Sequence, residues 1–264
     1  MFSINIIAPF QTSFTIKTDC QKLIDSVILK YGKYAIENIS QTDITIIAKK
    51  EKSGYNIYFN GNCLKTNAPL REIERIMYEN RKYAEDVFAV HGGAVEFNDS
   101  AYLVVAATTS GKTTLTSHLT SNGCGYITDD CVLIDRTNFN IHPFTTPMHL
   151  RQGGFEVLKN LKLEPERFEF LNDVSIKRYV YTPKNCVTHQ IPLKKIFFIE
   201  RTENINDSQD MSTTEKMTYL LKSPIINYKL DANYLSFISR LAKVPCKKLY
   251  YCDMDFVFKE IKNG

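Results

Sequence analysis

The sequence predicts a mixed α/β protein that begins with a small β-rich unit. Before residue 87, several short segments alternate apolar and polar residues, which is typical of strands with one buried face. After residue 88, apolar strand-like runs alternate with segments that carry helix-capping signals. We therefore predict two parts, with residues 1–87 as the N-terminal unit and residues 88–264 as a larger domain.

In the first part, strands are expected where short alternating runs meet turn signals. They fall on residues 4–6, 13–16, 43–48, 55–59 and 64–66. Ser53-Gly54 and Asn60-Gly61 predict turns between the last three, because glycine readily adopts the positive φ of tight turns. Apolar residues between 23 and 28 predict one helix. Asn67 is expected to cap a second helix that has Pro69 in its first turn.

The second part carries a succession of strand and helix signals. Strands are expected at residues 90–97, 101–105, 125–128, 131–135, 193–199 and 248–251. Helices are expected at residues 114–122, 155–167, 212–221, 234–243 and 256–261. Ser212 and Glu215 form a capping box, and Asp231 is a second N-cap. Residues 201–211 are polar and predict a loop.

The composition excludes several classes of protein. A formal net charge of +4, without a long run of lysine and arginine, does not indicate nucleic-acid binding. No apolar run approaches the roughly 20 residues that cross a bilayer, and the first residues lack a signal-peptide pattern. The seven cysteines include no C-x-x-C pair and predict free thiols in a reducing compartment. We expect a cytoplasmic protein without nucleic-acid or membrane partners, and leave a homo-oligomer open.

A loop between an apolar strand and a helix is the most specific feature of the sequence. Its backbone N–H groups and the helix N-terminus attract anions. Lys112 adds a full charge toward the outer phosphates, and the Thr113 hydroxyl can hold Mg²⁺. We therefore expect the chain to bind a nucleoside triphosphate. The residues expected to contact it are Thr109, Ser110, Gly111, Lys112, Thr113 and Thr114.

One position of this loop departs from the usual phosphate-binding pattern. Ala106 stands where the pattern begins with glycine. Alanine tolerates ordinary strand dihedrals, so this position does not require positive φ. Gly111, beside the lysine, is intact. An ordinary strand-to-helix turn is the alternative, and the flanking strand and helix favour phosphate binding over it.

Asp129 and Asp130 form an acidic pair at the end of a short apolar, strand-like segment. Phosphoryl chemistry needs one carboxylate near Mg²⁺ and another near the attacking hydroxyl. Neighbours on an extended chain point in opposite directions, so the two residues can divide these tasks. A solvated turn is the alternative. The position of the pair, on a strand neighbouring the loop, favours the catalytic interpretation.

Basic residues add further candidates. His91 precedes Gly92-Gly93 on the strand before the loop strand, and lies beside the loop end if the two strands are antiparallel. A lone histidine is more often structural, but the glycines allow close approach of a ligand or of backbone. Arg151 is a candidate to neutralise transferred charge, with Lys177 and Arg178 as weaker ones. For these three, a surface position is the alternative.

These features, in this order, resemble the HPr serine kinase/phosphorylase family, notably its short relatives from peptide-modification gene clusters. The matching residues are His91-Gly92, Ser110-Gly111-Lys112-Thr113, Gly125-Tyr126-Ile127-Thr128-Asp129-Asp130, His142-Pro143-Phe144 and Phe198-Ile199-Glu200-Arg201. The similarity covers residues 91–201, with a weaker match at residues 244–250. It implies a P-loop kinase core on a mixed sheet, similar to the HPr kinase C-terminal domain and to phosphoenolpyruvate carboxykinase.

The resemblance also implies an activity. The γ-phosphoryl group of ATP would pass, with Mg²⁺, to a serine hydroxyl of a peptide or protein acceptor. By position, Thr113 and Asp130 would contact the metal, and Arg151 would contact the nucleotide. The Asp129-Asp130 pair would supply the base, and the division of roles between them is left open. The residues implied to be catalytic are Lys112, Asp129, Asp130 and His91.

Two departures from the family pattern bear on the substrate. Ala106 and Thr108-Thr109 replace a more glycine-rich loop, and the glycine-rich signature that full-length HPr kinases carry after the acidic strand is missing. These departures favour a dedicated kinase on another acceptor over HPr and over the reverse phosphorylase reaction. The alternatives are a non-catalytic nucleotide-binding module and a small-molecule kinase with the same chemistry.

Overall fold

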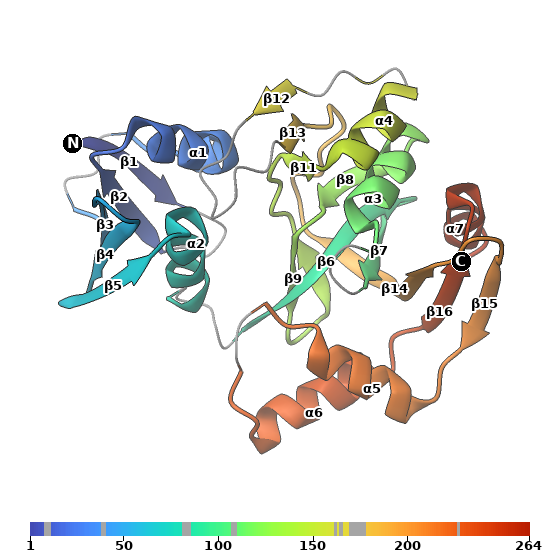
Figure 1. Cartoon of the computed structure of the whole chain (residues 1–264). Coiled ribbons are helices and arrows are strands. Elements are labelled where there is room, and N and C mark those ends of the chain that lie inside the picture. Colours follow the sequence, from blue (N-terminus) through green and yellow to red (C-terminus); the bar gives the residue numbers. More distant parts are fainter. Residues whose placement is uncertain are drawn as a thin grey trace. The chain divides into compact units, whose positions relative to one another are not determined.

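The computed structural model describes residues 1–7, 12–37, 41–80, 86–106, 110–160, 163, 166–168, 178–225 and 228–264. The chain divides into two compact units, Met1–Ala84 with Glu166–Tyr179 and Glu85–Pro165 with Val180–Gly264. Strands and helices mix in both units, so the protein is of the mixed α/β class (Figure 1). The division into domains 1–87 and 88–264 stays a prediction, because compactness alone does not show that either part folds independently.

The first unit contains a five-stranded sheet. Its strands, in their order across the sheet, are β1 (Phe2–Ile7), β2 (Ser13–Thr18), β3 (Ile44–Lys50), β4 (Tyr55–Phe59) and β5 (Asn62–Thr66). β2 and β3 pair in parallel, because α1 (Gln21–Tyr31) and the short 3-10 helix η1 (Gly32–Tyr34) carry the chain between them. A further helix, α2 (Pro69–Glu79), follows β5. The strands and the first helix predicted for this part are confirmed.

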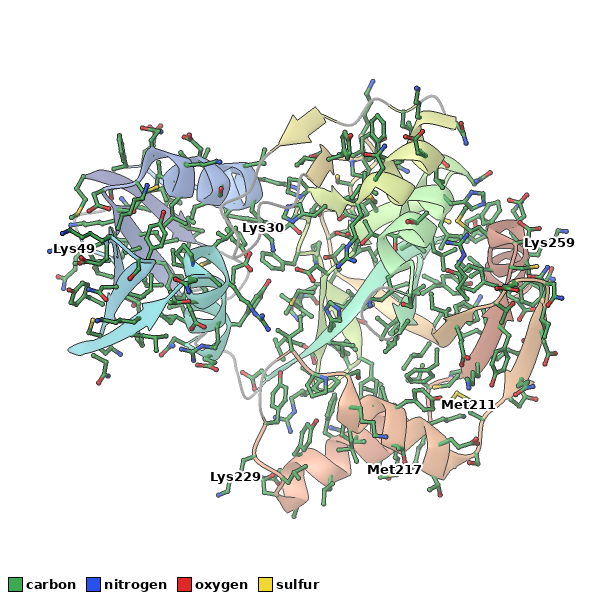
Figure 2. The ribbon with its side chains drawn as sticks, viewed as in Figure 1. Lys30, Lys49, Met211, Met217, Lys229 and Lys259 are labelled. Carbon is green, nitrogen blue, oxygen red and sulfur yellow. The ribbon has the colours of Figure 1, made fainter. Side chains whose placement is uncertain are left out.

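One face of this sheet packs against α1 and α2. Alternate apolar side chains of the strands, such as Phe14 and Ile46, are fully buried with Leu23 of α1. Lys30 of α1, labelled in Figure 2, forms an ion pair of 2.6 Å with Glu74 of α2. Both side chains are largely buried, so each charge is compensated by the other.

The start of α2 differs from the prediction that Asn67 caps it. Ala68 occupies the N-cap position, without a side-chain capping hydrogen bond. The Oδ1 atom of Asn67 lies instead against Gly54, where an added Cβ would clash with it. Thr66 Oγ1 accepts a hydrogen bond of 2.9 Å from the Ala68 N–H. The prediction failed because the Asn67 side chain lies against the neighbouring turn, a contact that the local sequence does not reveal.

An eight-stranded sheet forms the centre of the second unit. Its strands are β6 (Val87–Phe97), β7 (Ser100–Val105), β8 (Gly125–Thr128), β9 (Cys131–Asp135), β10 (Asn140–His142), β14 (Ile191–Arg201), β15 (Asp207–Asp210) and β16 (Cys246–Tyr251). Their order is β10-β9-β6-β7-β14-β16-β15, and β8 also pairs with β6. β7, β14 and β16 run parallel, so their carboxyl ends lie at one edge, while β6 runs antiparallel to β7.

Helices cover both faces of this sheet (Figure 1). They are α3 (Lys112–Ser121) and α7 (Met254–Lys262) on one face and α5 (Thr213–Lys222) and α6 (Ala232–Leu241) on the other, while α4 (Gln152–Asn160) packs on α3. Leu103 and Val104 are neighbours on β7 and therefore face opposite sides. Leu103 belongs to the core under α5 and α6, and Val104 to the core under α3 and α7. Among the described residues, no helix has the length and apolar character needed to cross a membrane.

The helix predicted at residues 155–167 is corrected where the structure describes it, since residues 161, 162, 164 and 165 lie outside the described residues. α4 begins earlier and ends at Asn160, and two short strands follow it, β12 (Glu166–Phe168) and β13 (Arg178–Tyr181). Gly154 allows α4 to pack closely on the preceding strand β11 (Met148–Leu150), since an added Cβ would lie 2.9 Å from Leu150 Cδ2. Packing thus explains Gly154, whereas a Cβ on Gly153 would meet nothing within 4 Å. The two consecutive glycines hide this helix start from a propensity argument.

The loop predicted at residues 201–211 is also corrected. Residues Asp207–Asp210 form β15, which pairs in antiparallel fashion with β16 at the edge of the sheet. An edge strand exposes both faces and tolerates polar side chains, so its polar composition imitates that of a loop. By contrast, the Ser212/Glu215 capping box of α5 and the Asp231 cap of α6 are confirmed.

β6 is the strand that positions the candidate site residues. Gly92 pairs with Val105, the last residue of β7, and its N–H donates a hydrogen bond of 3.2 Å to the Asp130 carbonyl on the other side. β8 and β9 both pair with β6, and the two strands are separated only at Asp129-Asp130. The antiparallel pairing on which the position of His91 depends is thereby confirmed.

The glycines of β6 allow close approach of other parts of the chain, rather than of a ligand. A Cβ on Gly92 would lie 2.8 Å from the Val104 carbonyl oxygen, and a Cβ on Gly93 would lie 2.5 Å from Thr116 Oγ1 of α3. Close approach of backbone, one of the two readings of Gly92-Gly93, accounts for both positions. The tight packing of α3 on β6 in turn holds the helix N-terminus near the sheet edge.

Gly93→Ala is expected to destabilise the protein, because the new methyl group would overpack the contact between β6 and α3. Overpacking of this kind costs about 1–3 kcal/mol. Thermal unfolding should show a lower Tm, and the cost should shrink in a Thr116→Ala background that lacks the opposing oxygen. Gly153→Ala on α4 is the control, because a Cβ there meets nothing within 4 Å. Equal stability of the two alanine variants would contradict this account.

Candidate functional site

The loop between β7 and α3 ends in a left-handed glycine. Gly111 has a φ of +89° and is the N-cap residue of α3, which has no side-chain capping hydrogen bond among the described residues. A Cβ at this position would be strained by the backbone and would lie 3.3 Å from the Tyr251 hydroxyl. The uncapped first turn of α3 therefore suits an anionic ligand. Thr109, predicted to contact that ligand, lies outside the described residues.

Lys112, the first residue of α3, is a buried cation with only 6% of its surface exposed. Its Nζ atom donates a hydrogen bond of 2.9 Å to the carbonyl oxygen of Ala106. Burial lowers the pKa of the Lys112 ammonium, and the negative charges of Asp130 and Asp129 oppose that shift. The lysine and the acidic pair, distant in sequence, therefore share one electrostatic environment.

The two aspartates occupy different environments. Asp129 is buried, with 6% of its surface exposed, and its Oδ1 atom accepts a hydrogen bond of 2.9 Å from the Tyr126 hydroxyl. The Asp130 side chain is 44% exposed, and its Oδ1 atom lies 3.4 Å from His91 Nδ1. Asp129 is thus a fixed carboxylate inside the site, whereas Asp130 opens to solvent beside the histidine.

His91 is held by the chain that leaves α5. Its backbone N–H donates a hydrogen bond of 2.8 Å to the Ser223 carbonyl, and the Ile225 N–H donates one of 3.0 Å to the Ala89 carbonyl. Val90 and Pro224 form a bridge between these two bonds. The segment after α5 therefore continues the sheet beside β6, beyond the point where β7 ends. It leaves the imidazole 38% exposed next to Asp130.

Most of the remaining predicted site residues lie in or near α3, whereas the weaker candidate Lys177 lies outside the described residues. Thr113 and Thr114 are half-buried in its first turn, and Ser117 Oγ donates a hydrogen bond of 2.7 Å to the Thr113 carbonyl. Ser110 lies in the loop, and its carbonyl accepts a long hydrogen bond of 3.5 Å from the Tyr251 hydroxyl. Arg151 is exposed just before α4, so its contact with a nucleotide stays a prediction.

Two tyrosines at this site were not singled out by the sequence analysis. Tyr126 appeared there only within a strand and within the Gly125–Asp130 segment of the resemblance, and Tyr251 only as the end of the last strand. In the structure Tyr126 bonds Asp129, while Tyr251 reaches the loop at Ser110 and Gly111. A buried phenol needs a hydrogen-bond partner, so a tyrosine three residues before an aspartate was the available signal for Tyr126.

The residues present fit a magnesium nucleotide better than a metal held by protein alone. The described residues contain no group of three or more histidine, cysteine, aspartate or glutamate side chains that could hold a metal ion. Mg²⁺ at phosphate sites is typically bound through one or two carboxylates together with phosphate oxygens. Thr113, Asp130 and a bound polyphosphate would make such a ligand set. The uncapped α3 N-terminus and the buried Lys112 suit that polyphosphate.

Comparisons with known proteins add little to this geometry. No protein-family model matches the chain, and no curated protein matches its sequence. One similar solved structure is the HPr(Ser) kinase/phosphatase from Coxiella burnetii, with a TM-score of 0.32 and 10% identity over 66% of this chain and 97% of that chain. A TM-score this low does not establish a shared fold, so the geometry of the site itself has to support a function.

Gly111→Ala is expected to destabilise the fold by about 1–2 kcal/mol, because alanine is strained in the left-handed region. It should also weaken ATP binding, since the loop must shift to relieve the contact with Tyr251. Thermal unfolding and calorimetric titration with ATP measure the two effects. Gly123→Ala is the matched control, because Gly123 has a φ of +101° with open space around it. An ATP affinity equal in both variants would contradict the predicted role of the loop.

Proposed function

We propose that this chain is an ATP-dependent kinase that transfers the γ-phosphoryl group, with Mg²⁺, to a serine or other hydroxyl of a peptide or protein acceptor. One observation carries the proposal. A buried lysine at an uncapped helix N-terminus shares its electrostatic environment with two carboxylates, one of which faces a histidine. The ordered motifs that resemble HPr serine kinases agree with this chemistry, and the proposed core is the P-loop kinase core of that family.

The residues of the site divide into binding and chemical roles. The first turn of α3 and Lys112 would bind the phosphates, because helix N–H groups and an ammonium oppose their charge. The bound nucleotide and metal supply the phosphoryl group and the neutralisation of its developing charge. Thr113 and Asp130 would hold the metal. The aspartate pair would remove the proton of the acceptor hydroxyl, which phosphoryl transfer leaves to a positioned carboxylate.

The acceptor hydroxyl is expected to approach from the side of Asp130 and His91. These two side chains are the partly exposed members of the cluster, whereas Lys112 and Asp129 are buried. An external hydroxyl can therefore reach the outer pair without a rearrangement of the sheet. A non-catalytic nucleotide-binding module would need the lysine, the loop and one carboxylate for the metal, but it would have no use for a second carboxylate and a histidine beside them.

The direct test is a transfer assay. The protein is incubated with ATP, Mg²⁺ and a library of serine-containing peptides, and mass spectrometry detects added phosphoryl groups. Transfer is expected to stop when a chelator removes Mg²⁺ and to return when Mg²⁺ is restored, because the metal neutralises charge on the phosphates. Tight ATP binding without transfer to any peptide, protein or small alcohol would instead support a binding module.

Substitutions should separate binding from chemistry. Lys112→Met is expected to weaken ATP binding and to lower transfer about a hundredfold or more, because a charge-stabilising group is lost. Asp129→Asn and Asp130→Asn should each lower transfer by about 10²–10⁴-fold, the range typical of lost acid–base groups. Asp129→Asn should keep ATP binding, whereas Asp130→Asn should also weaken binding of the Mg²⁺ complex of ATP, because a metal ligand is lost. Lys194→Met, on an exposed position of β14, is the control and should behave as wild type. Full transfer by both asparagine variants would refute the role given to the acidic pair.

A further inference from the structure

Tyr126 carries a buried hydroxyl that the proposed chemistry does not use. Its backbone is fixed on both sides of β8. The Tyr126 N–H donates a hydrogen bond of 2.8 Å to the Asn185 carbonyl, and its own carbonyl accepts one of 2.8 Å from the Val187 N–H. On the other side it pairs with Val95 of β6. The side chain is completely buried, so the position of its hydroxyl is set by the fold.

The Tyr126 hydroxyl lies between two acceptors. It is 2.9 Å from Asp129 Oδ1 and 2.8 Å from the carbonyl oxygen of Thr146. Asp129 and Thr146 are both buried, with 6% and 2% of their surfaces exposed. A phenol has one hydrogen to donate, and a carboxylate is the stronger acceptor. The hydroxyl therefore donates preferentially to the ionised carboxylate of Asp129, with the Thr146 carbonyl as its second acceptor.

This arrangement fixes the direction of one carboxylate of the acidic pair. Free aspartate side chains rotate about two bonds, and a fixed backbone does not by itself orient the carboxylate. Asp129 is hydrogen-bonded to Tyr126 and shares the environment of Lys112, where burial lowers the lysine pKa and the charge of Asp129 opposes that shift. Asp130, by contrast, lies beside His91 at the solvent boundary. The fold thus orients the Asp129 carboxylate through its hydrogen bond with Tyr126.

We infer that Tyr126 is a positioning residue for phosphoryl transfer, which holds the Asp129 carboxylate in its working orientation beside Lys112. The inference rests on the proposed function and assigns to this site a residue that contacts neither nucleotide nor acceptor. No proton, electron or group is exchanged by Tyr126. Its contribution is orientation, and misorientation of a catalytic group costs rate much more than it costs binding.

The test compares Tyr126→Phe with Tyr102→Phe. Tyr102 is an equally buried tyrosine of the same sheet whose ring stacks on Phe197, so its variant controls for the loss of a buried phenol. Tyr126→Phe is expected to lower kcat for transfer to the peptide acceptor about tenfold to a hundredfold. Its Kd for ATP, measured by titration without acceptor, should stay within about twofold of wild type, because the loop and Lys112 are untouched.

A second readout does not depend on activity. The nucleotide-free protein is unfolded by denaturant for wild type, Tyr126→Phe, Asp129→Ala and the double variant. If the tyrosine acts through the aspartate, the double variant loses less stability than the sum of the two single variants, and its remaining loss relative to Asp129→Ala reflects the hydroxyl's bond to the Thr146 carbonyl. Additive losses would show that the two side chains are not coupled and would overturn the inference. A Tyr126→Phe chain that failed to fold would also overturn it, since positioning leaves the fold intact.

The outcomes separate this inference from the proposed function. Absence of transfer by the wild-type protein would defeat the kinase proposal, whatever the unfolding experiment shows. Transfer by wild type together with a kcat of Tyr126→Phe equal to that of Tyr102→Phe would defeat only the positioning role. A parallel fall of kcat, ATP affinity and stability in Tyr126→Phe would mark a structural residue and would count against the inference as well.

Discussion

The site depends on the shared pairing of β6 with β7 and with β9. Gly92 lies between the last residue of β7 and Asp130, and it hydrogen-bonds to the acidic segment. This pairing brings the loop that follows β7 within one strand of the Asp129-Asp130 break. It is possible only because Gly92 and Gly93 lack side chains, since the Val104 carbonyl and Thr116 occupy the space that a Cβ would need. The close backbone packing at Gly92 and Gly93 is therefore what brings the charged residues of the site together.

The electrostatics of the site follow from burial. An ammonium buried as deeply as that of Lys112 is costly unless it is paired or hydrogen-bonded. Ala106 supplies a carbonyl acceptor, and the two aspartates supply negative charge that opposes the lowering of the lysine pKa. A strongly anionic ligand would further stabilise the buried ammonium of Lys112. The same low-dielectric surroundings that make an isolated lysine expensive strengthen its interaction with phosphate.

Residues outside the loop and the acidic pair hold the chemical groups in place. The segment after α5 fixes the backbone of His91 through Ser223, and the Tyr251 hydroxyl supports the loop beside Gly111. The Tyr126 hydroxyl donates a hydrogen bond to the Asp129 carboxylate and fixes its orientation. These supports come from three separate stretches of the chain, all of them joined by the central sheet. A site assembled in this way can orient its groups before any ligand arrives, which is the main requirement of phosphoryl transfer.

The sequence by itself determined the strands and helices with clear periodicity and the caps of α5 and α6. It also determined that a helix begins at Gly111 and Lys112. Each of these depends on residues within one or two turns of chain. Tertiary structure alone decided that Asp129 contacts Tyr126, that His91 faces Asp130, and that polar residues 207–210 form an edge strand. Those outcomes depend on strand pairing and burial. The local sequence carried a signal only for the first, a tyrosine three residues before an aspartate, and it could not show that the two side chains would be buried together.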